Sequence, residues 1–265
     1  MSYKSTTYVS KPVDAQGFVA YTEDENAVWH DLIKRQLAFV PGRACNEYMH
    51  GIKALDLPLD RIPQCPDVSD ALEAATGWRL EPVPALIPFD KFFSLLAHKR
   101  FPAATFIRRR EDFNYLTEPD IFHEIFGHCP LLTNPAYADF THTYGKLGLA
   151  AAPQDRAMLA RLYWFTIEFG LIQNPEGLRA YGGGILSSIG ETEYSLTSPI
   201  PERRPFDPLD VLRTPYRIDV MQTVYFVLDH FDTLYQLTQM DLVGLIREAR
   251  SLGEHAPTYP VATKE

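Results

Sequence analysis

The chain has 265 residues, of which 46% are hydrophobic and 22% charged, a balance typical of soluble globular proteins. Its 25 Lys and Arg against 34 Asp and Glu give a formal net charge of −9, which argues against a nucleic-acid partner because phosphate binding needs clustered basic side chains. Three irregularly spaced cysteines argue against a disulfide framework. We find no signal peptide and no apolar run long enough to span a bilayer, so we expect a cytoplasmic protein without a membrane partner.

The spacing of apolar residues predicts a mainly α protein. Thr22 and Glu25 have the spacing of a capping box that starts a helix, which ends before Pro41. One further helix is expected to begin at Thr117 and to contain Asp120 in its first turn. Residues 104–108 form a candidate strand, and residues 182–184 open a loop with strand-like flanks. The other predicted helices cover residues 45–55, 68–76, 90–99, 136–149, 155–172, 220–237 and 242–252.

The candidate chemistry is concentrated in the segment from Asp120 to His128. His123 and His128 lie five residues apart with aromatic residues between them, and imidazole is a good ligand for zinc, iron, copper and nickel. On an α-helix this spacing separates two side chains by roughly 140°. Both therefore reach one ion only if the helix ends or tightens at Gly127, which Pro130 favours. Two unrelated core or surface histidines are the alternative.

A third ligand candidate is Glu168, the only charge within residues 163–169. A carboxylate among aromatic side chains is costly unless it is paired or binds a metal, and pairing with an arginine or exposure to solvent stays open. Two histidines and one carboxylate form the facial triad of non-haem iron(II) oxygenases, which leaves coordination positions open for other ligands.

Two other classes of function remain as alternatives. The zinc-peptidase pattern H-E-x-x-H resembles the segment and would use His123, Glu124 and His128 in a zinc hydrolase, but its histidines are four residues apart, not five. A helical binding module without metal is the other alternative.

Three ordered blocks of sequence resemble the pterin-dependent aromatic amino acid hydroxylases, and the resemblance covers about residues 20–235. It implies a mainly α catalytic fold of about eight or more helices with a few short strands, mononuclear iron(II), tetrahydrobiopterin or a related reduced pterin, and O2 as co-substrate. It places one catalytic domain over residues 21–252, between a loosely held arm (1–20) and a polar tail (253–265). The blocks are residues 118–128, 162–170 and 180–191, and residues 44–48 and 62–69 fit the same pattern.

Position by position, the resemblance makes His123, His128 and Glu168 the iron ligands. It makes Arg108 the residue that binds the amino acid carboxylate, which suits the bidentate fork of a guanidinium, and Asp120 the acid that holds Arg108. Its other substrate positions are Pro119, Trp164, Phe169, Gly184 and Ser187, of which Ser187 is also placed to hydrogen bond a ligand histidine. Its pterin positions are Ala85, Leu86, Ile87, Phe92, Glu124 and Tyr163. For the aromatic residues, ordinary core packing is the alternative.

The expected substrate is L-phenylalanine, which would be converted to L-tyrosine, because short members of the family act on phenylalanine. L-Tryptophan and L-tyrosine are the alternatives within the family. Leu116 stands where members of the family often have a threonine, and Pro102 stands where the animal enzymes have a histidine, so both bear on substrate choice. After Leu252 the chain has no heptad helix and it lacks the length of a regulatory domain, so we expect an unregulated monomer.

Overall fold

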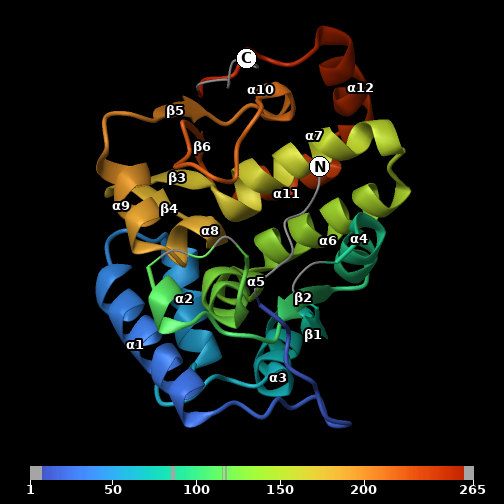
Figure 1. Ribbon diagram of the computed structural model, residues 1–265. Coiled ribbons are helices and arrows are strands. Elements are labelled where there is room, and N and C mark those ends of the chain that lie inside the picture. Colours follow the sequence, from blue (N-terminus) through green and yellow to red (C-terminus); the bar gives the residue numbers. More distant parts are fainter. Residues whose placement is uncertain (1–7, 85–86, 115, 117, 260–265) are drawn as a thin grey trace, which may run out of the picture.

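The computed structural model describes residues 8–84, 87–114, 116 and 118–259, and it confirms the prediction of a mainly α fold (Figure 1). Within these ranges every helix is too short or too polar to cross a membrane. The α-helices are α1 (Glu23–Phe39), α2 (Asn46–Leu55), α3 (Cys65–Thr76), α4 (Phe89–Ala97), α5 (Cys129–Leu132), α6 (Pro135–Ala150), α7 (Arg156–Tyr163), α8 (Gly183–Leu186), α9 (Ile189–Thr197), α10 (Pro208–Arg213), α11 (Asp232–Gln239) and α12 (Leu242–Leu252). Four short helices of other types are η1 (Arg110–Asp112), η2 (His123–His128), η3 (Pro153–Asp155) and η4 (Trp164–Glu168).

The first helix shows how closely local sequence sets an element. The Thr22 hydroxyl accepts a hydrogen bond from the Glu25 backbone N–H at 3.3 Å, and the Glu25 carboxylate accepts one from the Thr22 N–H at 2.7 Å, so the predicted capping box is confirmed. Trp29 lies fully buried on the inner face of α1, and its indole N–H donates to the Pro58 carbonyl at 2.8 Å. The cap therefore starts the helix and the apolar face anchors it to the core.

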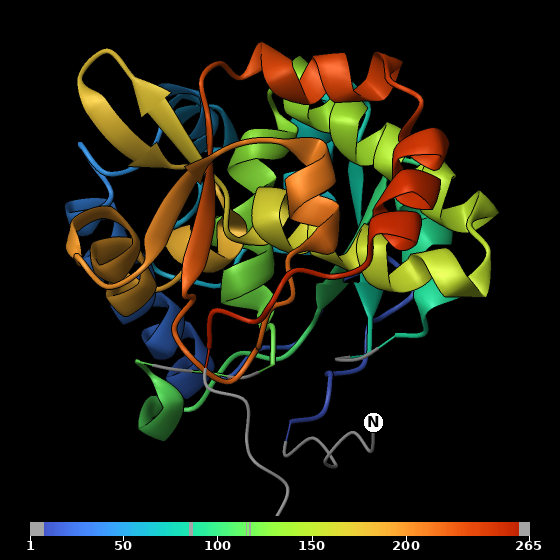
Figure 2. The same cartoon turned by 90° about the horizontal axis from the view of Figure 1, so that it is seen from above.

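Two small sheets complete the fold. Strands β1 (Arg79–Val83) and β2 (Arg100–Ala104) pair in parallel. A four-stranded sheet has the order β4–β3–β6–β5, with β3 (Leu171–Asn174) antiparallel to β4 (Gly177–Ala180) and β6 (Val224–Leu228) parallel to both β3 and β5 (Glu202–Pro205). Figure 2 shows this sheet beside the central helices, among which α6 packs against both α4 and α11.

The predicted helix over residues 220–237 is wrong. Residues 224–228 form the buried strand β6, and helix α11 begins only at Asp232. The run Val-Tyr-Phe-Val-Leu is continuously apolar because β6 lies between β3 and β5, and such a run cannot be told from a buried helix by its period.

Smaller errors concern the ends of elements. The candidate strand over residues 104–108 lies earlier, at Arg100–Ala104, and the helix predicted over 155–172 ends at Glu168, before β3. The loop expected at residues 182–184 runs into the short helix α8. The expected helix start at Thr117 lies outside the described residues, and the helical backbone begins at Ile121.

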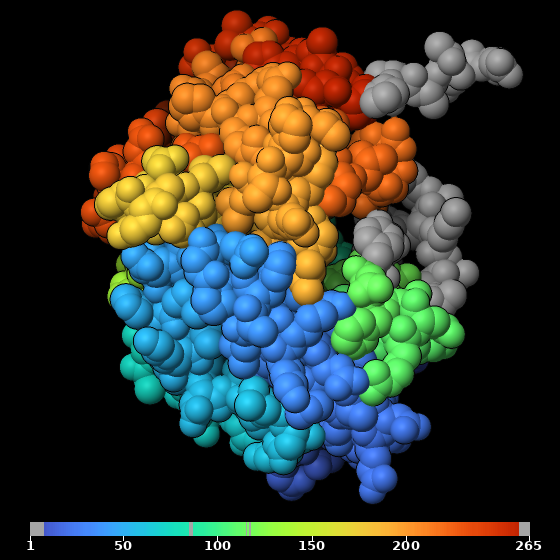
Figure 3. All heavy atoms as spheres, turned by 90° about the vertical axis from the view of Figure 1, so that its left-hand side faces the viewer, coloured from blue at the N-terminus to red at the C-terminus, as the bar shows by residue number. Residues whose placement is uncertain are grey.

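The described part of the amino-terminal arm is held by specific contacts, so the expectation of a loose arm is wrong for residues 8–20. The Ser10 hydroxyl donates to the Val83 carbonyl at 3.0 Å. The Tyr8 ring stacks on Phe106, with ring centroids 4.7 Å apart. Figure 3 shows the described residues of the amino-terminal third (blue) at one end of the molecule and those of the carboxyl-terminal third (orange to red) toward the other.

Helix α2 depends on a glycine where it meets α5. A Cβ atom on Gly51 would lie 1.9 Å from the Pro130 carbonyl oxygen, a contact with backbone that cannot move aside cheaply. We expect Gly51→Ala to lower the free energy of unfolding by about 1–3 kcal/mol, although alanine is the better helix former. Denaturant titration measures this change. The matched control is Gly190→Ala on exposed α9, where the nearest atom is 4.0 Å away, and it should be neutral or stabilising. Equal midpoints for the two variants would contradict the close packing.

Candidate metal centre and amino acid pocket

A widened helical turn carries the two histidines. Residues 123–128 form the π-helix η2, which continues into α5, so the expectation that the helix ends or tightens at Gly127 is wrong: the helix widens there. In a π-helix the hydrogen bond joins residues i and i+5, and side chains five residues apart therefore lie nearly above one another. The Nε2 atoms of His123 and His128 are 3.0 Å apart.

A second π-helix, η4, brings the carboxylate to the same point. The Phe169 N–H donates to the Trp164 carbonyl at 2.8 Å, which closes the wide turn. Glu168 Oε1 lies 3.3 Å from His128 Nε2, and Oε2 lies 3.6 Å from His123 Nε2. Glu168 therefore faces both imidazoles, although it is 40 residues further along the chain than His128.

Hydrogen bonding defines the tautomer of His123. The Ser187 hydroxyl donates its only proton to the Gly183 carbonyl at 2.8 Å. It must therefore accept the hydrogen bond from His123 Nδ1, which is 2.9 Å away. Nδ1 then carries the imidazole proton, and the lone pair on Nε2 faces Glu168. An imidazole needs this tautomer to bind a metal through Nε2.

Charge at the cluster favours a cation. Burial lowers the pKa of His123 to about 4, so this imidazole is neutral at neutral pH. Burial opposes ionisation of Glu168, but the two histidines and the Gly184 backbone N–H outweigh it and lower its pKa. The three ligand atoms lie within 4.8 Å of one another. Metal–nitrogen bonds of about 2.1 Å would separate neighbouring ligands by about 3.0–3.4 Å, so the cluster fits one divalent ion.

His128 is positioned by packing. Its Nδ1 atom is buried and has no hydrogen-bond partner among the described residues. The Phe101 ring lies 5.0 Å from the imidazole, centroid to centroid. A Cβ on Gly183 would come within 2.4 Å of the imidazole, so α8 can pack here only with glycine at this position.

A buried ion pair adjoins the metal centre. Arg108 donates to both oxygens of Asp120, from Nε at 2.8 Å and from Nη2 at 2.9 Å. The backbone N–H groups of Arg108 and His123 donate to the same carboxylate at 2.9 and 3.0 Å. Burial would raise the pKa of Asp120, but Arg108 and these N–H groups lower it, so the pair is ionised. The predicted contact between Arg108 and Asp120 is present.

Aromatic rings gather around Trp164. Its ring centroid lies 4.4 Å from that of Phe169 and 4.4 Å from that of Tyr216, on which it stacks at 13°. Pro119 is half-buried immediately before Asp120. A Cβ on Gly184 would lie 3.0 Å from Phe169 and 3.1 Å from the Glu168 carboxylate.

The candidate pterin positions are brought together only in part. Phe92 on α4 meets Tyr163 on α7 edge to face, with centroids 5.3 Å apart. Glu124 is buried, and burial raises its pKa well above the usual range. Ile87 is half-buried just before α4. Ala85 and Leu86 lie outside the described residues.

Two pocket residues had no signal in the sequence. Tyr216 and Gln222 belong to the connection between α10 and β6, and Gln222 hydrogen bonds Trp164. The wrong helix over 220–237 concealed this connection. Leu116 packs against the cluster of Tyr8, Ala104 and Phe106, and Pro102 is buried in β2, so their effect on substrate choice stays a prediction.

A mainly helical domain that presents two imidazoles and one carboxylate at a single point has the donor set of a mononuclear metal-dependent enzyme. The comparisons with known proteins specify the family. The family model of the biopterin-dependent aromatic amino acid hydroxylases matches residues 3–242. The chain therefore belongs to the biopterin-dependent aromatic amino acid hydroxylases.

Individual relatives match over nearly the whole chain. The phenylalanine-4-hydroxylase of Pseudomonas aeruginosa is 58% identical over 257 residues, which cover 97% of this chain and 98% of that protein. The apo structure of the cold-active phenylalanine hydroxylase from Colwellia psychrerythraea has a TM-score of 0.94 at 53% identity and covers 97% of this chain and 100% of that chain. The phenylalanine hydroxylase of Chromobacterium violaceum, solved with oxidised Fe(III), has a TM-score of 0.88 at 42% identity and covers 95% and 94%.

Gly183 offers a direct test of the metal centre. In Gly183→Ala the new methyl group meets the His128 ring, which Phe101 also contacts. We expect iron(II) affinity to fall by about 10–100-fold, the range seen when the support of a metal ligand is disturbed. Metal titration with Gly190→Ala as control measures the change, and circular dichroism checks the fold. Unchanged affinity in a folded Gly183→Ala variant would show that His128 does not bind the metal.

Proposed function

We propose that this hydroxylase is an iron(II)- and tetrahydrobiopterin-dependent monooxygenase that converts L-phenylalanine to L-tyrosine with O2. The observation that carries the proposal is the convergence of His123, His128 and Glu168 beside the buried pair of Arg108 and Asp120. The relatives named above as phenylalanine hydroxylases support the choice of substrate. The catalytic domain would cover residues 21–252.

The three metal ligands would hold iron on one face. Iron(II) and a reduced pterin, when bound, supply the activation of O2 that ring hydroxylation needs. Ser187 keeps Nδ1 of His123 protonated, so Nε2 is available to the metal. Phe92, Tyr163, Glu124 and the segment 85–87 would bind the pterin, with Phe92 as the ring on which it stacks.

Arg108 would bind the carboxylate of the amino acid. The Asp120 side chain accepts hydrogen bonds from Nε and Nη2 of Arg108. The other edge of the Arg108 guanidinium can therefore form a bidentate contact with a second carboxylate. Because Asp120 also binds the His123 backbone N–H, the substrate arginine and a metal ligand share one support. The rings of Trp164 and Phe169, with Pro119 and Gly184, would enclose the aromatic side chain.

Two alternative functions, a different aromatic substrate and a zinc hydrolase, relate differently to this site. Hydroxylation of L-tryptophan or L-tyrosine would use the same residues. Two observations disfavour a zinc hydrolase: the family model of the hydroxylases matches residues 3–242, and the five-residue spacing of His123 and His128 departs from the four-residue spacing of the zinc-peptidase pattern.

Three buried free thiols, Cys45, Cys65 and Cys129, support a cytoplasmic location. We also propose a monomer, which light scattering would test.

Aerobic turnover tests the function directly. We expect protein supplied with iron(II) and tetrahydrobiopterin to form L-tyrosine from L-phenylalanine, and to turn over L-tryptophan and L-tyrosine more slowly. Chromatography of the products measures each reaction. His123→Ala should lose both iron and activity. Zinc retention with peptide hydrolysis, or preferred hydroxylation of another amino acid, would overturn the assignment.

Substitution of Arg108 tests the substrate contact. Arg108→Lys keeps a charge beside Asp120 but removes the planar fork, so the KM for L-phenylalanine should rise by about 10–100-fold, equivalent to the loss of a hydrogen bond between charged groups. Iron content should change little. Arg109→Lys is the matched control, because this neighbouring side chain is 60% exposed. Loss of iron with an unchanged KM would refute the role of Arg108.

A further inference from the structure

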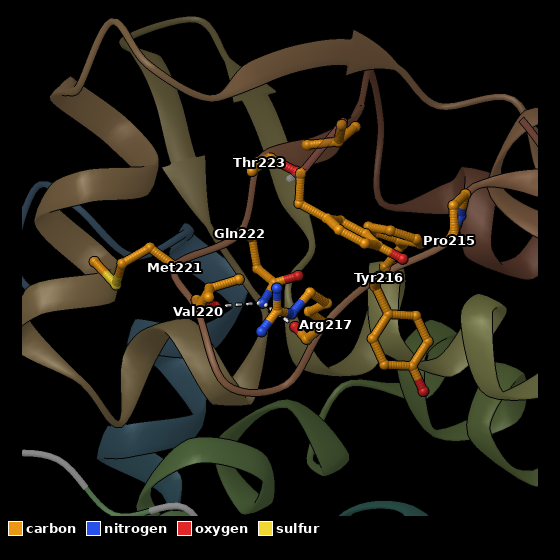
Figure 4. Close-up of a pocket in the computed structure, with 10 residues that line it drawn as sticks. Pro215, Tyr216, Arg217, Val220, Met221, Gln222 and Thr223 are labelled. Atoms are coloured by element: carbon orange, nitrogen blue, oxygen red, sulfur yellow. Dashed lines mark hydrogen bonds between the residues drawn. The ribbon is translucent and has the colours of Figure 1, made fainter. Parts of the chain in front are cut away.

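Figure 4 shows the connection from Pro215 to Thr223, in which the Gln222 side chain hydrogen bonds within the connection itself. The Gln222 amide also accepts a hydrogen bond from Trp164, outside the connection. We propose that Gln222 is a positioning residue that sets the plane of the Trp164 indole, and with it the selectivity of the pocket among aromatic amino acids. The inference rests on the proposed role of Trp164 in binding the substrate ring.

The amide of Gln222 has all its principal partners inside the protein. Gln222 is only 5% exposed to solvent. Its Oε1 accepts from Trp164 Nε1 at 2.9 Å, and its Nε2 donates to the carbonyls of Arg217 at 2.9 Å and Val220 at 3.2 Å. The indole nitrogen can only donate and carbonyls can only accept, so this orientation of the amide is the one that satisfies every group.

Stacking completes the restraint on Trp164. Tyr216, from the same connection, stacks on the indole at 13°, and Phe169 lies against it at 34°. Rotation of the indole would break the stack and leave its N–H without an acceptor. The hydrogen bond and the stack therefore both favour the observed plane of the indole.

The connection is itself anchored to the sheet. Tyr225 on β6 donates to the buried carboxylate of Glu191 on α9, and the Gln222 backbone N–H lies 3.5 Å from the same carboxylate. Gln222 therefore stands between a fixed strand and the π-helix η4.

The cavity beside Gln222 is too small to be a separate binding site, which favours a positioning role for this residue. The cavity lined by Phe165, Tyr216, Gln222 and Tyr259 measures about 10 Å³, which is room for one water at most. No amino acid or cofactor fits there, so this packing acts on the protein's own side chains.

Selectivity measured in four proteins tests the proposal: wild type, Gln222→Met, Trp164→Phe and the double variant. Gln222→Met keeps volume but removes the acceptor. We expect its ratio of kcat/KM for L-phenylalanine over L-tryptophan to change about 3–10-fold, mainly through KM, as loss of one hydrogen bond implies. Trp164→Phe removes the donor and should reduce the further effect of Gln222→Met to under about 2-fold, because coupled residues are not additive. Gln239→Met, the same change at an exposed position of α11, should have no effect.

An equal fall in kcat for every substrate, or the same effect of Gln222→Met with and without Trp164, would overturn the proposal. Acrylamide quenching of tryptophan fluorescence separates this outcome from failure of the proposed function. Trp29 and Trp78 are fully buried, so an added quenchable component reports Trp164. If the wild type turns over no amino acid, the proposed function fails, and increased quenching in Gln222→Met still supports the restraint on Trp164. Quenching identical to wild type would exclude that restraint.

Discussion

The structure of the site depends on the wide turn from His123 to His128. A regular α-helix would point these imidazoles roughly 140° apart, so one ion could not bind both. The π-helix aligns them, and a second π-helix ending at Glu168 supplies the carboxylate. Such turns lack the regular hydrogen bonds of an α-helix, so surrounding groups must hold them. At η2 this support comes from Asp120, which accepts from the His123 N–H, and from the close approach of α8.

Close backbone packing and a buried charge hold the turn together. Gly127 and Gly183 allow η2 and α8 to approach, since a Cβ on Gly127 would lie 2.8 Å from the Gly183 carbonyl. Asp120 accepts four hydrogen bonds, three of them from Arg108. A buried carboxylate is stable only when it is paired in this way. The same ion pair therefore fixes the orientation of the Arg108 side chain and the start of the turn that carries the histidines.

Much of this arrangement could be predicted from the sequence, and the failures have identifiable causes. The capping box at Thr22 and the isolated charge of Glu168 are local signals, and both led to correct contacts. The five-residue spacing of the histidines showed that the helix must be irregular, but a tightened and a widened turn satisfy the same spacing. Strand β6 is apolar at every position, so its period could not separate strand from helix. That error also concealed Gln222, whose partner lies 58 residues away.

The aromatic cluster around Trp164 and the candidate metal centre are built on one turn, and this limits how each can vary. Trp164 opens η4 and Glu168 ends it, and the hydrogen bond from Phe169 to the Trp164 carbonyl closes it. A movement of the Trp164 backbone therefore acts on the backbone that carries the carboxylate. Groups outside the turn can adjust the ring without moving the ligand, because they contact only the side chain. Tyr216 and Gln222 are such groups, which makes their connection the part of the fold best placed to change selectivity while the metal ligands stay unchanged.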